Sequence, residues 1–244
     1  MDVLKSAISG SAPRNSHSRV VDELGRAIVG GTFISGTILP GDIELAQRFK
    51  VSRTVLREAM KTLAAKGMVV PKTRIGTRVT GRNNWNLFDA DVLAWHLESA
   101  TDTRFLEHLS EMRLSFEPFA ARLASERVSS DEVRSLYAQV EEMEKANSME
   151  SFALADLDFH MALLGASGNP FMYSLGALIE AALATSFRLS SPFGEPDLQQ
   201  ETALAHRRIV DAIAARNPEN AAEAMDRVIV VGRDRITGAL SPRR

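Results

Sequence analysis

Residues 42–80 contain the pattern that most restricts how this chain can fold. One short apolar-periodic segment begins at Ile43 and a second spans Thr54–Lys66, with the tight turn Val51-Ser52-Arg53 between them. The second segment ends at Lys66-Gly67, a basic last turn followed by glycine, which is typical of a helix C-terminus. Two short helices joined by a turn predict a helix-turn-helix, and the β-like stretches 68–71 and 78–80 predict a two-stranded wing.

The polar residues of this segment suit contact with DNA. A recognition helix needs short polar side chains at its start and arginines that can reach the edges of guanine. The second helix begins with such residues: Ser52, Arg53, Thr54 and Arg57. The wing adds candidates for contact with the DNA backbone or minor groove: Lys72, Arg74, Gly76, Thr77 and Arg78. The alternative is that the two arginines are surface charges balanced by Glu44 or Glu58.

Residues 18–80 resemble the winged helix-turn-helix of GntR-type bacterial transcription regulators. The resemblance rests on Leu39-Pro40, Glu44-Leu45-Ala46, Phe49, Val51-Ser52-Arg53-Thr54-Val55, Arg57-Glu58-Ala59, Leu63, Lys66-Gly67, Gly76-Thr77 and Val79. The family often has a basic residue where this chain has Ile43, so we expect no base contact there. The resemblance implies that this part of the chain binds double-stranded operator DNA.

Charge is divided unevenly along the chain. Residues 1–80 hold 13 Lys and Arg against 6 Asp and Glu, whereas residues 81–244 hold 16 against 25. This asymmetry indicates that the first part meets a polyanion and the second does not, unless it only reflects chance segregation on solvated faces. The absence of cysteine excludes disulfides and thiolate metal sites. No apolar run approaches the roughly 20 residues that span a bilayer, so we expect a cytoplasmic protein without a membrane partner.

Turn signals and composition divide the chain into four parts. We expect a flexible arm at 1–17, a winged helix-turn-helix domain at 18–80, a linker with a short helix at 81–100, and a helical domain at 101–240. Both tryptophans, Trp85 and Trp95, lie in the linker, where we expect them to dock its helix onto a neighbour rather than to stack on a ligand. The remainder predicts six helices, at 103–128, 130–146, 149–166, 170–189, 197–216 and 218–239. The predicted fold class is mainly α, with a small wing followed by an all-α antiparallel bundle.

Three side chains of the predicted bundle suggest a metal site. Asp156 and His160 are four residues apart on one helix and so point in the same direction, and His206 lies on a later helix of similar apolar character. A carboxylate and two imidazoles that converge inside a bundle can bind a divalent cation. The spacing alone favours the alternative, in which Asp156 forms a polar pair with His160 or an arginine and His206 is an ordinary histidine.

Residues of about 100–235 resemble the FCD-type ligand domain found in the FadR subgroup of the same family. The stretch Asp156-Leu157-Asp158-Phe159-His160 and the segment around His206 carry this resemblance. It implies a divalent metal, zinc or similar, held by Asp156, His160 and His206. The fourth ligand of the family falls at Val228, so we expect at most three protein ligands, with water or effector oxygens in the open positions.

The resemblance also implies an effector pocket. It places Arg113, which is four residues before Glu117, at the pocket wall, where a planar guanidinium suits a bidentate carboxylate. Arg188 is a second candidate, and Asn169 either caps a helix or faces the pocket. The full set of expected effector-binding residues is Arg113, Asp156, His160, Asn169, Arg188 and His206. The chain also resembles regulators of sugar-acid catabolism, of the kind that repress a galactonate operon, which implies an effector such as D-galactonate. This resemblance rests on Asn84-Trp85-Asn86, Asp89, Asp91-Val92-Leu93, Trp95 and Val228.

We therefore expect a homodimeric transcription regulator, a repressor, that binds a two-fold symmetric operator under the control of a small organic acid. The alternative is a metal-dependent enzyme that acts on a small acid and has a fused DNA-binding domain. Against it, the sequence shows no nucleophile–base constellation and no general-acid pair. A third option is an architectural DNA-binding protein that has no effector.

Overall fold

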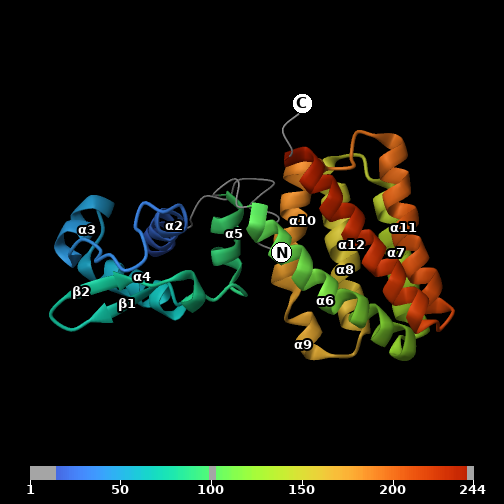
Figure 1. The fold of residues 1–244 in the computed structure, drawn as a ribbon, viewed down its shortest axis with the longest axis horizontal. Helices are drawn as coiled ribbons and strands as arrows, with labels where there is room; N and C mark the ends of the chain where they lie inside the picture. The colour runs from blue at the N-terminus through green and yellow to red at the C-terminus, as the bar shows by residue number, and fades with distance from the viewer. Residues whose placement is uncertain (1–14, 99–102, 241–244) are drawn as a thin grey trace. The chain divides into compact units, whose positions relative to one another are not determined.

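The computed structural model describes residues 15–98 and 103–240, apart from the side chains at positions 98, 103, 188, 190, 196 and 240. The predicted arm at 1–17 lies outside these residues except for its last three, of which Ser16 and His17 already belong to the first helix. The chain divides into two compact units, residues 2–102 and 103–244 (Figure 1). Within the described ranges, every helix is too short or too polar to cross a membrane.

The N-terminal unit contains the predicted helix-turn-helix and wing, which the structure confirms. Its elements are α2 (Ser16–Val29), α3 (Asp42–Phe49), α4 (Arg53–Ala65), β1 (Val69–Lys72), β2 (Gly76–Val79), the 3₁₀ turn η1 (Arg82–Asn84) and α5 (Ala90–Glu98). The three helices α2, α3 and α4 bury one apolar face each, and these faces meet in a common core with the first strand. Burial of these faces holds the helices together, because helices this short are marginal alone.

The wing is an antiparallel pair whose register runs from Val69 opposite Val79 to Lys72 opposite Gly76. Gly76 has φ 116°, a left-handed conformation that side-chain-bearing residues rarely adopt. A Cβ at this position would also come within 3.1 Å of the Ile38 side chain. The glycine therefore lets the wing turn back sharply.

The linker helix α5 packs within the N-terminal unit. Trp85 and Trp95 are both buried in the core of the N-terminal unit, and the indole Nε1 of Trp95 donates a 2.8 Å hydrogen bond to Asp22 on α2. The Lys66 ammonium, at the end of α4, contacts Asp89 at 2.7 Å and Asp91 at 2.8 Å at the start of α5. These contacts confirm that the tryptophans dock the linker helix onto its neighbour.

Residues 103–240 form the predicted all-helical bundle (Figure 1). Its helices are α6 (Thr103–Arg127), α7 (Ser130–Lys145), α8 (Met149–Ala166), α9 (Pro170–Tyr173), α10 (Gly176–Ser190), α11 (Pro196–Ala214) and α12 (Pro218–Leu240). The helix α12 packs against α6 and α11, α7 packs against α8 and α11, and α10 contacts α8 and α12. The prediction of one helix at 170–189 was wrong, because the chain turns at Ser174 and Leu175 and makes two helices, α9 and α10.

Candidate DNA-binding surface and effector cavity

The start of α4, the second helix of the helix-turn-helix, presents the predicted DNA-binding residues to solvent. Ser52 is the N-cap, and its side-chain oxygen accepts a 3.2 Å hydrogen bond from the backbone N–H of Val55. Arg53, Thr54 and Arg57 are exposed, whereas the opposite face of α4 is buried in the core. The cap therefore leaves the hydroxyl proton of Ser52 free to donate to a phosphate.

Arg57 has a weak partner in the structure. Its Nε lies 3.5 Å from Oδ2 of Asp42, and the two side chains are 70% and 50% exposed. The carboxylate of Glu58, which the alternative interpretation assigned to the arginines, contacts Lys61 at 2.8 Å instead. An exposed ion pair of this kind contributes about 1 kcal/mol or less, so Arg57 can exchange Asp42 for another anion at little cost.

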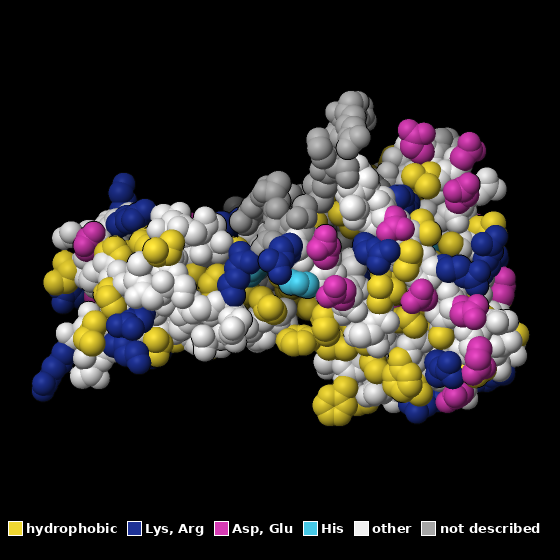
Figure 2. Space-filling view, viewed as in Figure 1, with side chains coloured by type: hydrophobic (Ala, Val, Ile, Leu, Met, Phe, Trp, Pro, Cys, Tyr) yellow, Lys and Arg dark blue, Asp and Glu magenta, His cyan; other side chains and the backbone are white. Residues whose placement is uncertain are grey.

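The wing supplies a second exposed basic surface. Lys72, Arg74 and Arg78 are exposed, as is Gly76, while Thr77 is half-buried. On the face shown in Figure 2, Asp and Glu side chains are mixed with Lys and Arg over the helical bundle, whereas the charged side chains visible on the N-terminal unit are mostly Lys and Arg. The basic surface of the wing thus lies on the same unit as the helix-turn-helix.

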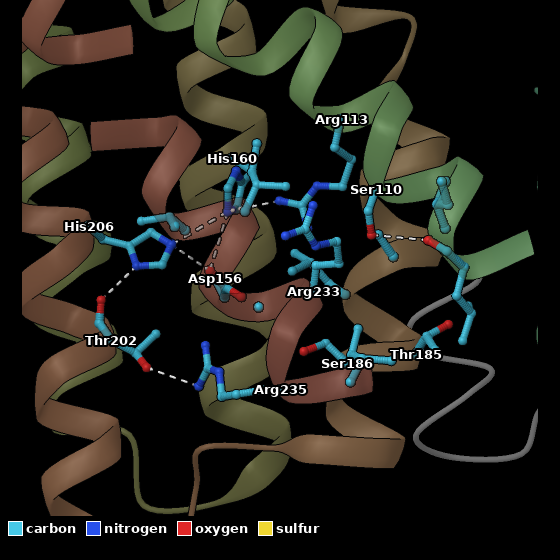
Figure 3. Close-up of a pocket in the computed structure, with 18 residues that line it drawn as sticks. Ser110, Arg113, Asp156, His160, Thr185, Ser186, Thr202, His206, Arg233 and Arg235 are labelled. Atoms are coloured by element: carbon cyan, nitrogen blue, oxygen red, sulfur yellow. Dashed lines mark hydrogen bonds and ion pairs between the residues drawn. The ribbon is translucent and has the colours of Figure 1, made fainter. Parts of the chain in front are cut away.

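A cavity of about 560 Å³, counting the part of it that is open to solvent, lies inside the bundle. Its walls come from five helices, α6, α8, α10, α11 and α12. Figure 3 shows its polar residues, which are Ser110, Arg113, Asp156, His160, Thr185, Ser186, Thr202, His206, Arg233 and Arg235. Residues far apart in sequence therefore meet in one polar, arginine-rich cavity.

Asp156, His160 and His206 form a compact buried cluster in this cavity. Their ligand atoms all lie within 4.8 Å of one another. Oδ1 of Asp156 lies 3.0 Å from Nε2 of His206 and 3.6 Å from Nε2 of His160, and the two Nε2 atoms are 3.5 Å apart. A tetrahedral zinc ion with bonds of about 2.0–2.1 Å needs ligand atoms about 3.3–3.4 Å apart, so the three atoms are close to the required spacing.

Groups behind the two histidines orient their rings. Nδ1 of His206 is 2.8 Å from the carbonyl oxygen of Thr202, which can only accept, so Nδ1–H can donate to it while Nε2 faces Asp156. Nδ1 of His160 is 2.7 Å from Oε2 of Glu117, close but not aligned as a hydrogen bond. Metal-binding histidines commonly have a carbonyl or carboxylate in these positions.

The charges around the cluster favour an ionised carboxylate at Asp156. Its Oδ1 is buried and receives no hydrogen bond, which suits an oxygen that ligates a cation. Burial opposes its ionisation, but His206, His160 and Arg113 outweigh burial and lower the pKa of Asp156 from 3.8 to about 2. The donor set therefore fits a divalent cation, with two imidazole nitrogens and one carboxylate oxygen.

Arg113 lies at the cavity wall as predicted, but it is already paired. Its Nε and Nη2 bond the carboxylate of Glu117, which is fully buried one turn further along α6. Burial opposes ionisation of Glu117, but Arg113 and His160 outweigh it and lower the pKa of this carboxyl from 4.5 to about 2. Nη2 of Arg113 also lies 3.5 Å from Nε2 of His160, so the guanidinium is next to the cluster.

The other predicted pocket residues lie in different places. Asn169 caps α9, accepting a 3.0 Å hydrogen bond from the N–H of Phe171, and it is not among the residues that line the cavity. Arg188 lies on α10, and its side chain is outside the described part of the structure. Val228, at the position of the family's fourth metal ligand, does line the cavity.

The sequence interpretation missed six polar residues of the cavity, among them Thr202 and Arg235. Nη1 of Arg235 donates to Oγ1 of Thr202 at 3.3 Å, while the Thr202 carbonyl faces His206. A signal for Arg235 was present, because it follows Val228 by seven residues, two turns along the same helix and hence on the same face. Thr202 had a similar signal, four residues before His206.

Comparison with known proteins agrees with this architecture. The family model of bacterial regulatory proteins, gntR family, matches residues 16–79, and that of the FCD domain matches residues 108–230. The HTH-type transcriptional regulator YieP of Escherichia coli K12 is 33% identical over 90% of this chain and 94% of its own. The galactonate operon transcriptional repressor of the same organism is 34% identical over 86% of this chain and 92% of its own. These two are similarly related, so the likeness does not single out the galactonate repressor.

A solved structure shows the same fold. The Listeria monocytogenes protein Lar, at 19% identity, superposes with a TM-score of 0.65 over 95% of this chain and 100% of its own. A winged helix-turn-helix combined with a helical domain of this kind defines a DNA-binding transcription regulator and not an enzyme. The chain belongs to the gntR family of bacterial regulatory proteins, in the FadR subgroup, which carries an FCD domain.

Proposed function

We propose that this protein is a homodimeric repressor whose affinity for operator DNA is controlled by a small sugar acid bound in the bundle cavity. The observation that supports this is the cavity itself, where Asp156, His160 and His206 meet beside arginines in a unit separate from the helix-turn-helix. The name of one relative, a galactonate operon repressor, supports both the repression and the class of effector. Because its partner is DNA, we place the protein in the cytoplasm.

In this proposal the N-terminal unit contacts DNA through two surfaces. The exposed start of α4 enters the major groove, where arginines recognise guanine and short polar side chains bind phosphate. These residues are Ser52, Arg53, Thr54 and Arg57. The wing contacts the backbone or the adjacent minor groove with Lys72, Arg74, Gly76, Thr77 and Arg78. A two-fold symmetric operator then requires two copies of the chain.

The cavity residues have complementary roles. Asp156, His160 and His206 hold a divalent ion such as zinc, which supplies open coordination positions for effector oxygens. Val228 cannot ligate, so three is the largest number of protein ligands that these positions provide. Arg113, paired with Glu117, faces an effector carboxylate at the ion. Effector binding changes operator affinity only if it favours one arrangement of the two DNA-binding units over another.

The test is an operator-binding titration with and without sugar acids, starting with D-galactonate and in the presence of zinc. The operator can be selected by the protein from random DNA. We expect Asp156→Ala and His206→Ala to remove the effect of the sugar acid while leaving operator affinity without it unchanged. The physical reason is that both side chains lie in the bundle cavity, whereas the proposed DNA contacts lie in the other unit.

A matched control is Asp158→Ala, which removes an exposed carboxylate from the same helix, α8. It should respond to the effector as the wild-type protein does. Chelation of the metal should reproduce the loss seen in the two cavity variants. Equal loss of operator binding and effector response would show that Asp156 and His206 are only structural, and the proposed site would be rejected.

A further inference from the structure

We infer that the effector is a dianionic sugar acid, with one anionic group at the Asp156–His160–His206 cluster and a second at Arg235. This inference rests on the proposed function and narrows the class of its effector. Two observations support it. The cavity arginines differ in whether a carboxylate of the protein pairs with them, and polar groups line the rest of the cavity.

The three cavity arginines differ in how their charge is balanced. Arg113 is bonded to the buried carboxylate of Glu117, and Arg233 contacts Asp234 at 2.9 Å. Arg235 has no carboxylate within ion-pair distance among the described residues, and its one hydrogen bond there is to the hydroxyl of Thr202. The charges of Arg113 and Arg233 are therefore paired with carboxylates of the protein, whereas the charge of Arg235 has no such partner among the described residues.

The guanidinium of Arg235 is arranged to receive an anion. Its Nε is buried and has no hydrogen-bond partner in the described structure. Burial lowers the pKa of Arg235, because Asp156 and Glu201 do not offset the loss of hydration. A buried cation with an unused donor is costly, and a planar guanidinium binds a carboxylate or phosphate through two parallel hydrogen bonds. An anionic group of the effector would remove this cost.

The two anion-binding points are separate. In Figure 3, Arg113 and Arg235 lie on opposite sides of Asp156, and Thr202 connects His206 to Arg235. We therefore assign a separate anionic group of the effector to each of these two points.

Hydroxyl groups of the cavity suit a ligand that itself carries hydroxyl groups. Ser110 donates to the backbone oxygen of Leu106, and Thr185 donates to that of Ala181. Because their protons are used in this way, both present oxygen lone pairs to the cavity. A lone pair accepts a hydrogen bond from a hydroxyl group and repels a carboxylate. These two residues therefore favour a ligand that carries hydroxyl groups beside its anionic groups.

The experiment compares two ligands that differ at one end. D-galactonate has a hydroxymethyl group at carbon 6, where galactarate has a second carboxylate on the same chain of hydroxyl groups. Calorimetric titration of the full-length, zinc-loaded protein should show that galactarate binds at least about tenfold more tightly, a difference of about 1.4 kcal/mol. Titration with 6-phosphogluconate, whose carboxylate and phosphate together carry about three negative charges, tests whether the second group is a phosphate. Tighter binding of galactarate or of 6-phosphogluconate than of galactonate supports the inference.

Variants assign the second anionic group to its residue. Arg235→Gln should reduce the affinity for the preferred dianion to that for galactonate while changing galactonate binding little. Arg227→Gln, an exposed arginine on the same helix, should preserve the preference. Operator binding without effector shows whether Arg235→Gln still folds, and Arg235→Lys, which keeps the charge, should retain part of the preference.

Two results would overturn the inference and leave the proposed function standing. One is that galactonate binds as tightly as galactarate and 6-phosphogluconate. The other is that Arg235→Gln weakens the binding of all three ligands by the same factor. If none of the three binds, the sugar-acid effector is itself rejected, and the dianion is rejected with it.

Discussion

Glu117 is a fully buried carboxylate that contacts two residues of the cavity wall. It bonds the guanidinium of Arg113 and lies 2.7 Å from Nδ1 of His160. Removing one partner of a buried ion pair leaves the other charge uncompensated, which destabilises the fold more than replacing both partners by apolar groups does. At the scale of single residues, the cluster therefore depends on a side chain that lies outside the ligand set.

The variant Glu117→Gln keeps the shape of this side chain and removes its charge. We expect stability to fall by about 3–5 kcal/mol, because Arg113 stays buried without its counterion. Zinc affinity should fall about 10- to 100-fold, because His160 loses the carboxylate behind its ring. Urea unfolding and a zinc titration measure the two effects. Glu219→Gln, which alters an exposed pair with Arg122, should change both very little. Wild-type zinc affinity in Glu117→Gln would contradict the role given to this residue.

The sequence predicted the candidate ligands better than it predicted their surroundings. Asp156 and His160 are one helical turn apart, His206 lies on a later helix of similar apolar character, and the family resemblance favoured a site made of all three, so the cluster needed no knowledge of packing. The contact between Glu117 and His160 joins α6 to α8, and neither helix shows it alone. Arg113 was expected at the pocket wall four residues before Glu117, and the structure shows the two bonded, which leaves Arg235 as the arginine without a carboxylate partner among the described residues.

At the scale of helices, the packing of α5 on α2 depends on a missing side chain. Gly25 lies in the middle of α2, and a Cβ built there would come within 2.4 Å of Cζ3 of Trp95. The glycine thus makes room for the indole, which also bonds Asp22 on the same helix. A larger residue at position 25 would force α5 away from α2 or shift the indole from its preferred rotamer.

Gly25→Ala should destabilise the N-terminal unit by about 1–3 kcal/mol through overpacking against Trp95. Gly165→Ala is the matched control, because Gly165 is also helical but has no atom within 4 Å of a built Cβ. That change should be neutral or stabilising by up to about 1 kcal/mol, as alanine favours helix more than glycine does. Denaturant unfolding of both variants measures the difference. A neutral effect at Gly25 would mean that Trp95 does not pack there in solution.

Most helices were predictable because their ends carry local signals. The helix α8 begins and ends where the sequence predicted, Met149 and Ala166, and Ser148 caps it with a capping box. The break between α9 and α10 was missed, because the apolar pattern of 170–189 continues through Ser174 and Leu175 without a proline or glycine between Phe171 and Leu175. Gly176, the first residue of α10, was the one weak signal of this turn. Its built Cβ would overlap Met161 on α8, so tertiary packing places the glycine there.

At the scale of the whole molecule, the uneven charge of the sequence corresponds to two units, of which the basic one contains the helix-turn-helix. Recognition of a two-fold operator by a homodimer doubles every contact that one DNA-binding unit makes. The exposed pair between Arg57 and Asp42 is weak, so transfer of Arg57 to a guanine costs little in the free protein. The loss caused by a substitution at Arg57 should therefore depend on how many half-sites are occupied.

Arg57→Ala should weaken binding by about 1–3 kcal/mol for each half-site that the protein occupies, if Arg57 contacts a guanine. Titrations against a symmetric operator and against one with a single intact half-site separate the contributions, and the loss on the symmetric operator should be twice the other. Arg134→Ala removes the same charge from an exposed position of the bundle and should leave both affinities nearly unchanged. Unchanged affinity in Arg57→Ala would reject α4 as the recognition helix. Equal losses on the two operators would instead reject the paired binding of two chains, because only one copy of Arg57 would then contact DNA.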